Sequence, residues 1–449
     1  MASTVIDYFP RLRASLMAAV TALVFATTAV VTTSGVHGEE HVAWPQWRGL
    51  RRDGQSDERG LLRDWRSAPP RSAWTVEHVG RGFSTPATTG DGLYVNGHFG
   101  EEEFLVAFRW PAGTGVATPE PTWRTSLGKT GDVSYPGSRS TPTVDGDRIY
   151  AQSTGGAIVC LNRATGDIIW QRHLVEDFGG TMMSHWGFSE SPLVDGEQVI
   201  VTPGSDAAAV VALNKSTGAT NWKSEIESAG GAAYSSLVVS EGAGVRQYIT
   251  LLGRGLVGVA ADNGRLLWTY DRIANKTANI PTPIVRGDDV FTSTGYQTGA
   301  ALVHLSRDGE KVKAEEVYFL PPKTLQNHHG GLVLVGDHVY GGAGHKQGFP
   351  ICVEFATGKV VWSRPRGPGD GSAAVSYADG HLYFRYQNGT MALIEATPEG
   401  YHEKGQFEIP QVEDPSWPHP VITRGLLLLR EQDRIHAYDC HEPPRSAAR

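Results

Sequence analysis

Eight polar or aromatic residues give this sequence its best prospects for chemistry. They are Arg139, Glu190, Tyr234, Asn279, His328, His329, Trp417 and His419. The three histidines with Glu190 are a candidate metal set, because imidazole and carboxylate suit several divalent cations. An arginine can hold a carboxylate or a phosphate through two parallel hydrogen bonds. The rings of Tyr234 and Trp417 can stack on a sugar or another flat ring.

Each of these interpretations has a structural alternative. The histidine spacing is not a metal motif, and adjacent histidines such as His328 and His329 usually point in different directions. Arg139 could instead form a structural ion pair with Asp370 or Glu190, and the two aromatic rings could pack in the core. No complete catalytic motif is present, so the sequence assigns neither a catalytic residue nor a metal ligand.

Composition excludes several classes of protein. The 449 residues carry a formal charge of -8, and no basic stripe points to nucleic acid. Three cysteines are too few for a disulfide framework or a zinc ribbon. The 54 glycines and 26 prolines predict frequent turns, which favours many short strands over long helices.

The N-terminal residues 1–38 are typical of a secretory signal peptide. Arg11 and Arg13 precede an uncharged run over 14–36, and the small residue Gly38 follows. The alternative is an uncleaved N-terminal anchor, although several threonines make the run weakly apolar for a spanning helix. We therefore expect an exported protein, periplasmic or extracellular, with no membrane span once the signal is removed.

Tryptophans recur at a nearly constant interval along the rest of the chain. They are Trp74, Trp123, Trp170, Trp222, Trp268 and Trp362, separated by 49, 47, 52, 46 and 94 residues. The last gap is two periods of 47, and Tyr318 falls near the missing position. Phe407 continues the series, which then has eight members. A period of 40 to 50 residues is the signature of a β-propeller blade.

Within each period the sequence predicts four antiparallel strands. A small or proline-containing pair such as Thr141-Pro142 opens a strand, and an Asp-Gly turn follows. Two further strands lead through a glycine turn to the tryptophan strand. The last repeat lacks its tryptophan strand, whereas the first has a spare one around Trp74. We therefore expect an all-β, eight-bladed propeller over 71–440, closed by this N-terminal strand in the last blade.

The flanking segments complete the expected organisation. Residues 39–70 are read as an N-terminal strap lying against the ring, and 441–449 as a C-terminal tail. In a propeller the opening strand of each blade lines the axis. The eight candidate residues mostly precede opening strands, so the fold would gather them at one mouth of the central channel. Polar groups converging on a concave site predict ligand binding there. His185, Trp186 and His345 are in nearby segments and could join the rim.

The repeat resembles the tryptophan-docking motif of pyrroloquinoline-quinone (PQQ) type propellers. Segments such as 160–170 and 212–222 share a small residue, an apolar residue, Asn, Thr-Gly and Trp. The resemblance implies that the six recurring tryptophans are docking residues. The family includes quinoprotein alcohol dehydrogenases and the propeller subunit of the outer-membrane protein assembly machine.

The resemblance leaves the cofactor and activity open. Quinoprotein dehydrogenases carry an adjacent cysteine pair, a calcium site and a catalytic Asp, whereas Cys160, Cys352 and Cys440 are far apart in this sequence. The sequence itself requires no cofactor, and PQQ with calcium or a divalent metal stays an alternative. We expect a monomeric binding scaffold for a partner protein, peptide or carbohydrate. The alternative is a quinoprotein-like dehydrogenase or a metal-assisted carbohydrate-active enzyme using the channel mouth.

Overall fold

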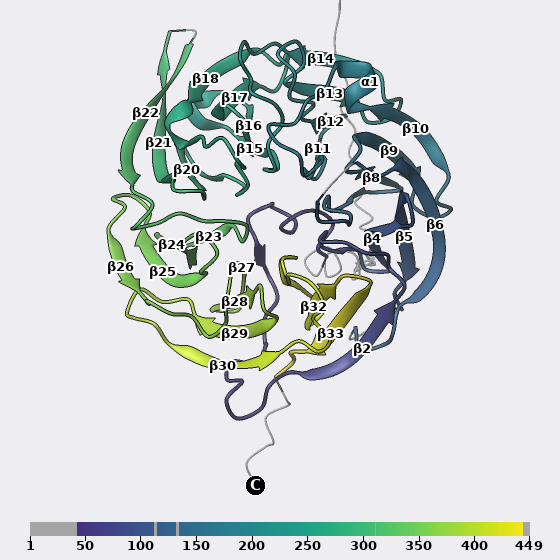
Figure 1. Ribbon diagram of the computed structural model, residues 1–449, viewed down its shortest axis with the longest axis vertical. Coiled ribbons are helices and arrows are strands. Elements are labelled where there is room, and N and C mark those ends of the chain that lie inside the picture. Colours follow the sequence, from purple (N-terminus) through teal and green to yellow (C-terminus); the bar gives the residue numbers. More distant parts are fainter. Residues whose placement is uncertain (1–42, 112–114, 132–133, 310, 443–449) are drawn as a thin grey trace, which may run out of the picture. The chain divides into compact units, whose positions relative to one another are not determined.

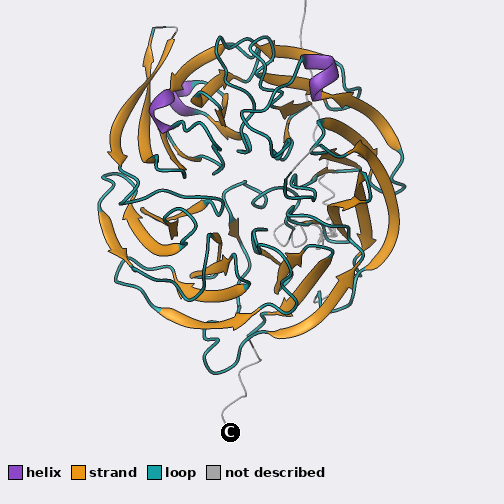
Figure 2. Ribbon diagram, in the orientation of Figure 1, coloured by secondary structure: helices purple, strands orange, loops and turns teal. Residues whose placement is uncertain are grey.

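The computed structural model describes residues 43–111, 115–131, 134–309 and 311–442. The predicted signal peptide therefore lies outside the described residues. The regular secondary structure of the described chain is almost entirely β-strand, with α1 (Leu174–Phe178), η2 (Gly242–Gly244) and η3 (Asp271–Ile273) as its helical segments (Figure 2). The strands form eight sheets arranged around a central axis (Figure 1). The all-β, eight-bladed propeller predicted from the sequence is confirmed.

The first four blades follow one another along the chain. Blade 1 contains β3 (Ala87–Thr88), β4 (Gly92–Phe99), β5 (Glu102–Arg109) and β6 (Glu120–Lys129); blade 2 contains β7 (Thr143–Asp145), β8 (Arg148–Gln152), β9 (Ala157–Asn162) and β10 (Ile168–His173); blade 3 contains β11 (Leu193–Asp195), β12 (Gln198–Val201), β13 (Val210–Asn214) and β14 (Thr220–Ser224); blade 4 contains β15 (Val238–Ser240), β16 (Gln247–Leu252), β17 (Gly255–Ala260) and β18 (Leu266–Tyr270).

The remaining four blades complete the ring. Blade 5 contains β19 (Ile284–Arg286), β20 (Asp289–Thr294), β21 (Gly299–Asp308) and β22 (Lys311–Leu320); blade 6 contains β23 (Leu332–Val335), β24 (His338–Ala343), β25 (Phe349–Glu354) and β26 (Val360–Ser363); blade 7 contains β27 (Ala373–Ala378), β28 (His381–Tyr386), β29 (Thr390–Glu395) and β30 (Glu403–Glu408); blade 8 contains β31 (Val421–Thr423), β32 (Leu426–Glu431), β33 (Arg434–Asp439) and β2 (Arg71–Glu77).

Blade 8 is built from both ends of the chain. The N-terminal strand β2 pairs antiparallel with β33, placing Ser72 opposite Tyr438 and Trp74 opposite Ala437. The ring therefore closes as the spare tryptophan strand predicts. Closure pairs the outer edge of β33, which would otherwise expose unpaired backbone groups.

A repeated turn explains why blades 2 and 3 have the same outer hairpin. In blade 2, the side-chain oxygen of Asn162 accepts hydrogen bonds from the backbone of Ala164 and Thr165. Gly166 then takes a φ of +77°, which glycine adopts without steric cost. The same Asn, Thr and Gly arrangement recurs at 214–218. The motif is therefore a turn whose side chain replaces a backbone partner.

The outer strand of every blade contains a bulge, which directly precedes the large aromatic residue in seven blades. In blade 2, for example, the register shifts between Ile168 and Trp170. Corresponding shifts occur in the other seven outer strands. In blade 7 the bulge lies between Glu403 and Gly405, so Phe407 is displaced by two residues from the position expected for the series. A bulge inserts one extra residue and redirects the neighbouring side chain. The periodic bulge was not visible in the sequence pattern.

The redirected rings contact the next blade. The Trp170 indole Nε1 donates to the Lys215 carbonyl at 2.9 Å, and its ring covers Gly218, where an added Cβ would lie 2.8 Å from the indole. Trp123 and Trp222 cover Gly166 and Gly264 in the same way, and Tyr318 covers Gly358. Trp268 differs, because its Nε1 donates within its own blade to Gln247 at 2.6 Å.

The strap, described here over 43–70, contacts all eight blades. Its β1 (Gln55–Ser56) pairs in parallel with β27 of blade 7. The remaining contacts are backbone bonds of Trp44 with Thr88 and of Pro45 with Val144, and side-chain bonds of Arg52 to Ser191, Pro192 and Leu237, of Trp47 to Thr282, of Arg48 to Leu332 and of Ser56 to Ile422. In Figure 1 the strap runs across the centre of the ring. It therefore crosses the channel and ties the innermost strands together.

Candidate functional site

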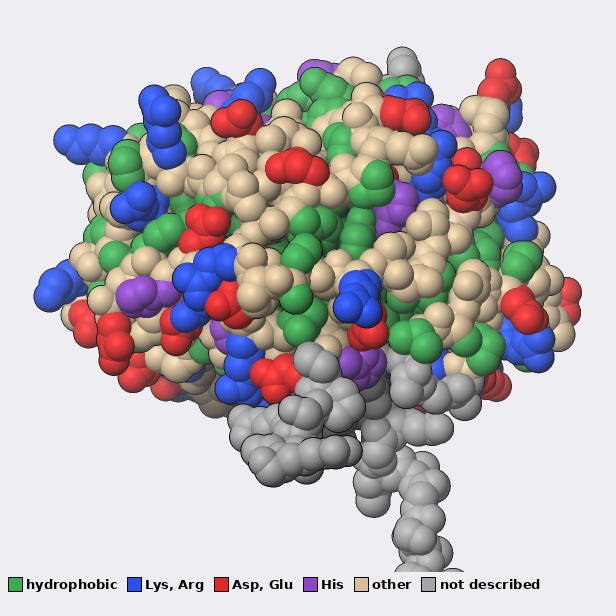
Figure 3. All heavy atoms as spheres, turned by 90° about the horizontal axis from the view of Figure 1, so that it is seen from below, with side chains coloured by type: hydrophobic (Ala, Val, Ile, Leu, Met, Phe, Trp, Pro, Cys, Tyr) green, Lys and Arg blue, Asp and Glu red, His purple; other side chains and the backbone are tan. Residues whose placement is uncertain are grey.

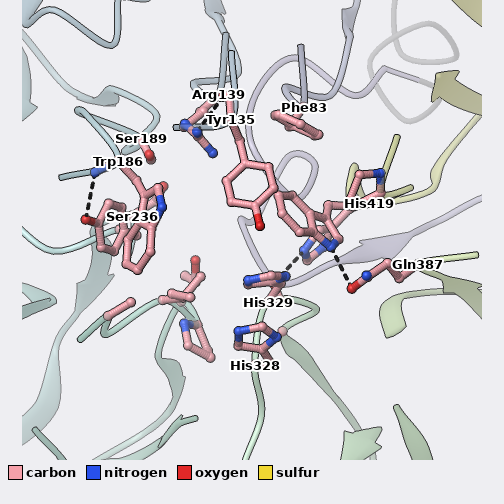
Figure 4. A pocket seen from close by; sticks show the side chains of 18 of the residues that line it. Phe83, Tyr135, Arg139, Trp186, Ser189, Ser236, His328, His329, Gln387 and His419 are labelled. Carbon is pink, nitrogen blue, oxygen red and sulfur yellow. Dashed lines mark hydrogen bonds between the residues drawn. The ribbon is translucent and has the colours of Figure 1, made fainter. Parts of the chain in front are cut away.

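A cavity of about 380 Å³ occupies one mouth of the channel. Its lining is Trp47, Arg48, Phe83, Tyr135, Arg139, Trp186, Ser189, Tyr234, Ser236, Ala278, Ile280, Pro281, Thr282, Tyr296, His328, His329, Gly331, Lys346, Gln387, Pro415, Trp417 and His419. All eight blades contribute, together with two residues of the strap. We call this cavity the mouth pocket; Figure 4 shows it from close by. A second cavity, also about 380 Å³, shares Arg48 with it and is lined by further strap residues.

Trp417 is the centre of one aromatic wall of the mouth pocket. Its ring lies 5.0 Å from that of Phe83, 5.2 Å from that of Tyr135 and 4.6 Å from the imidazole of His329. The indole Nε1 donates to Gln387 Oε1 at 3.0 Å, which fixes the ring's orientation. On another side, the rings of Trp186 and Tyr234 lie 5.8 Å apart. These walls suit a group with a flat or apolar part.

The histidines form a stacked cluster on a third side. The rings of His328 and His329 stack 3.5 Å apart, and His345 lies 4.3 Å from His328. His328 also bonds Ser372 Oγ at 2.7 Å and the Tyr296 hydroxyl at 3.2 Å. Burial lowers the pKa of His328 to about 3, and lowers that of His329 well below its usual value. The imidazoles are therefore neutral near pH 7.

This cluster does not form a metal centre in the described part of the chain. There, no three His, Cys, Asp or Glu side chains are grouped so that they could hold an ion. Ring stacking instead places the His328 and His329 imidazoles face to face, and His328 uses both ring nitrogens on Ser372 and Tyr296. The His419 ring packs against Trp47, at 4.7 Å between rings, and its Nε2 contacts the His329 carbonyl at 3.5 Å rather than another imidazole. The candidate metal set from the sequence is therefore not assembled.

Arg139 is a largely unpaired cation at the mouth pocket. Its Nη2 donates to the Tyr135 carbonyl at 2.8 Å, and its guanidinium lies 5.5 Å from the centre of the Phe83 ring. The Nε is buried and has no hydrogen-bond partner. Burial lowers the pKa to about 10, so the group stays charged at neutral pH. Within the described residues Arg139 forms no ion pair, and the predicted alternatives Asp370 and Glu190 are not its partners.

The charges on the pocket lining all have one sign. Arg48, Arg139 and Lys346 line the cavity, and no Asp or Glu is among the lining residues. The outer face shown in Figure 3 instead carries acidic and basic side chains interspersed. The whole sequence has a formal charge of -8. The mouth pocket is thus a positively charged, aromatic site in an acidic protein.

Six of the eight residues singled out in the sequence line the mouth pocket. They are Arg139, Tyr234, His328, His329, Trp417 and His419. Glu190 and Asn279 do not line it, which corrects the set predicted from the sequence. The Asn279 amide is fully buried and donates to the Leu252 carbonyl at 2.8 Å. Glu190 is buried beside Arg52 of the strap and Thr202, and burial raises its pKa to about 8.

Sequence reasoning missed part of the lining. Tyr296, Lys346 and Gln387 come from turns between the second and third strands of their blades. In an antiparallel blade those turns lie at the same end as the start of the first strand, so they could have been included. Trp47 and Arg48 come from the strap. The Arg- and Trp-rich composition of the strap was the available signal, but it does not reveal which side chains enter the channel.

The pocket does not match a calcium-dependent quinone site. Calcium takes six to eight oxygen ligands, usually including carboxylates. The pocket lining contains no Asp or Glu carboxylate. Cys160, Cys352 and Cys440 are buried and free of disulfide bonds, and none lines the pocket. The residues present therefore do not fit PQQ with calcium.

The fold and its central site define a repeat β-propeller with a ligand-sized channel mouth. A family model described as outer membrane protein assembly factor BamB matches residues 112–364, more than half of the chain. The protein belongs to this family of PQQ-type repeat propellers.

Curated relatives have the same description. BamB of Salmonella typhimurium is 33% identical over 143 residues, which cover 32% of this chain and 35% of that protein. BamB of Yersinia pestis is 27% identical over 287 residues, covering 60% of this chain and 66% of that protein. The chain thus aligns with about a third of the length of the first relative and about two thirds of the second.

Solved structures share the architecture at low sequence identity. BamB from Moraxella catarrhalis has a TM-score of 0.58 at 12% identity, covering 84% of this chain and 99% of that one. The quinohemoprotein alcohol dehydrogenase from Comamonas testosteroni has a TM-score of 0.63 at 12% identity, and the match covers 91% of this chain and 82% of that one. These likenesses establish the fold alone. Among the described residues, no helix has the length and apolarity needed to cross a bilayer.

Proposed function

We propose that this protein is an exported scaffold that binds a partner polypeptide at the mouth pocket. The observation that carries this proposal is the pocket itself. Side chains from all eight blades converge on one cavity with aromatic walls and unsatisfied polar groups. Such convergence is the usual mark of a binding site. The description of the family as an outer membrane protein assembly factor supports a partner that is a protein.

The chemistry of the lining supports binding over catalysis. His328 hydrogen-bonds the hydroxyls of Ser372 and Tyr296, but burial lowers the pKa of His328 to about 3, so its imidazole is a weak base for activating either hydroxyl as a nucleophile. The signal-like residues 1–38 and the relatives' link to outer-membrane assembly support export to the periplasm. A carbohydrate ligand is the main competitor, because aromatic walls also suit sugars.

A site-specific photocrosslinker tests the proposal. We would place a photoreactive amino acid at Ser189, which lines the pocket, and at Ile169, which is exposed on outer strand β10. Expression in the host periplasm should give a discrete polypeptide adduct from position 189 and none of that mass from position 169. The adduct should disappear with Trp417→Ala, which removes the pocket wall. Equal adducts from both positions, or an adduct unaffected by Trp417→Ala, would overturn it.

A thermal-shift screen addresses the enzymatic alternatives. Anything that binds the folded protein stabilises it by mass action. PQQ with calcium, transition metals and sugars would be added separately to wild type and His329→Ala. A rise in melting temperature that depends on His329 would favour a protein that binds a metal, a quinone or a carbohydrate over one that binds a polypeptide.

A further inference from the structure

The mouth pocket has more hydrogen-bond donors than the protein itself uses. Arg139 Nε and two Arg48 nitrogens, Nε and Nη1, are buried there without partners. A guanidinium nitrogen can only donate, so these positions need an acceptor. Leaving a buried donor unpaired is costly, so a ligand that supplies an acceptor at these positions would be favoured.

The charge balance identifies the kind of acceptor. The three formal charges on the lining are positive, and no carboxylate of the described chain lies among them. The imidazoles do not add to this charge, because burial keeps them neutral. An anion would supply both acceptors and compensating charge. A neutral group would leave the desolvated Arg139 uncompensated.

Arg139 is better placed than the other two cations to recognise this anion. Arg48 donates to the Asp53 and Leu332 carbonyls, at 2.9 and 2.5 Å, and so holds the strap in the channel. Lys346 is exposed at the rim. Arg139 has a single hydrogen bond, to the Tyr135 carbonyl, and the rest of its planar fork is unused within the described residues. That fork matches the two oxygens of a carboxylate.

The surroundings favour a carboxylate that is attached to a larger group. Phe83, Tyr135 and Trp417 pack around the guanidinium side of the pocket. A free inorganic anion would leave these rings facing water, whereas a residue of a polypeptide would bring apolar atoms with its carboxylate. The cavity of about 380 Å³ has room for one or two such residues.

We propose that the mouth pocket captures a carboxylate of the partner polypeptide and that Arg139 is the residue that recognises it. This inference rests on the proposed scaffold function and specifies the chemistry of its ligand. The carboxylate comes either from an Asp or Glu side chain or from the end of a chain. Both sources present the same two oxygens to the guanidinium, and an experiment can separate them.

Random soluble pentapeptides, synthesised as free acids and as C-terminal amides, test the proposal with the immobilised full-length protein. If a side chain supplies the carboxylate, bound amide peptides should be enriched in Asp and Glu about tenfold. If a chain end supplies it, free acids should be enriched over amides by a similar factor. Arg139→Gln should abolish either preference. Arg139→Lys, which keeps the charge but not the fork, should retain part of it.

The control is Arg109→Gln, because Arg109 is exposed on β5 and pairs with Glu120 away from the pocket. It should leave the preference unchanged. Peptides that bind equally with and without carboxylates would overturn the carboxylate inference and leave the scaffold function standing. Failure of every peptide to bind wild type would overturn both. A carboxylate preference that survives Arg139→Gln would assign recognition to another residue and contradict the role of Arg139.

Discussion

Arginines at two places in this propeller differ in their burial and in their partners: Arg385 and Arg430 are fully buried, whereas Arg139 is partly buried. At the seam between blades 7, 8 and 1, all three nitrogens of Arg385 and of Arg430 donate hydrogen bonds. At the channel mouth, Arg139 donates one bond and leaves its Nε unpaired. The seam arginines are satisfied by the protein, whereas the mouth arginine is not.

The seam shows what a structural arginine looks like in this fold. Arg430 of β32 donates to the carbonyls of Gly80 at 2.6 Å and Asn96 at 2.7 Å, so one side chain joins blade 8 to blade 1. Arg385 of β28 pairs with Glu431, and both are almost completely buried. The comparison teaches that burial alone does not identify a binding residue. The number of protein partners distinguishes Arg139, which has one hydrogen bond, from Arg385 and Arg430, whose nitrogens are all paired.

The largest expected effect is at the seam. Glu431→Gln would leave the Arg385 guanidinium buried without its counter-ion, and we expect a loss of about 3–5 kcal/mol in the free energy of unfolding. Denaturant unfolding monitored by tryptophan fluorescence measures it. The control Glu77→Gln, which removes an exposed partner of Arg434, should cost less than about 1 kcal/mol. A seam variant as stable as this control would show that the seam pair does not hold the ring closed.

A smaller loss is expected where an indole covers a glycine. Gly218→Ala would place a Cβ about 2.8 Å from the Trp170 ring at a φ of +71°, and we expect a loss of about 1–3 kcal/mol. Gly196→Ala is the matched control, because its φ is +58° and nothing lies within 4 Å of the added Cβ. The difference between the two unfolding free energies isolates the contact between blades. Equal unfolding free energies for the two variants would mean that the Trp170 ring moves aside without a measurable loss of stability.

The pH dependence of the free energy of unfolding should reveal the titration of Glu190, which faces Arg52 of the strap. Burial raises its pKa to about 8, whereas Arg52 and Thr202 lower it by less. The pKa of Glu190 in the folded protein exceeds the usual 4.5. The contribution of protonated Glu190 to the free energy of unfolding is therefore fully present below about pH 4.5. It declines as pH rises, by at most about 1.4 kcal/mol per pH unit, and is lost above about pH 8.

Glu190→Gln removes this titration. The unfolding free energy of wild type minus that of the variant should therefore fall between about pH 5 and pH 8. Denaturant titrations of both proteins across that range measure the difference. Parallel pH profiles would contradict the raised pKa and would indicate that Glu190 is ionised in the folded protein.

The architecture was predictable because its determinants repeat. The tryptophan interval, the glycine turns and the spare strand around Trp74 each report a local requirement that recurs in blade after blade. Together they predict the blade number and the pairing of β2 with β33. The bulge in each outer strand was not predictable, since it depends on how one strand pairs with its neighbour rather than on residue type.

The site was only partly predictable. The sequence places Arg139, His329 and Trp417 just before opening strands. Because the ring brings these positions to the axis, all three were correctly predicted to lie at the channel mouth. It could not say which way a side chain turns, so Glu190 and Asn279 were included although they point into packed surroundings. Hydrogen-bond satisfaction, which distinguishes Arg139 from Arg430, is a property of three-dimensional neighbours.

The most direct test is the unfolding free energy of Arg139→Met without any ligand. If Arg139 is retained for binding, replacing its desolvated charge by an apolar side chain should leave stability unchanged or raise it by about 1 kcal/mol. The measurement is denaturant unfolding beside wild type and Glu431→Gln. A loss of about 3 kcal/mol, comparable with breaking the seam, would show that Arg139 holds the fold together and would contradict its assignment as a ligand-binding residue.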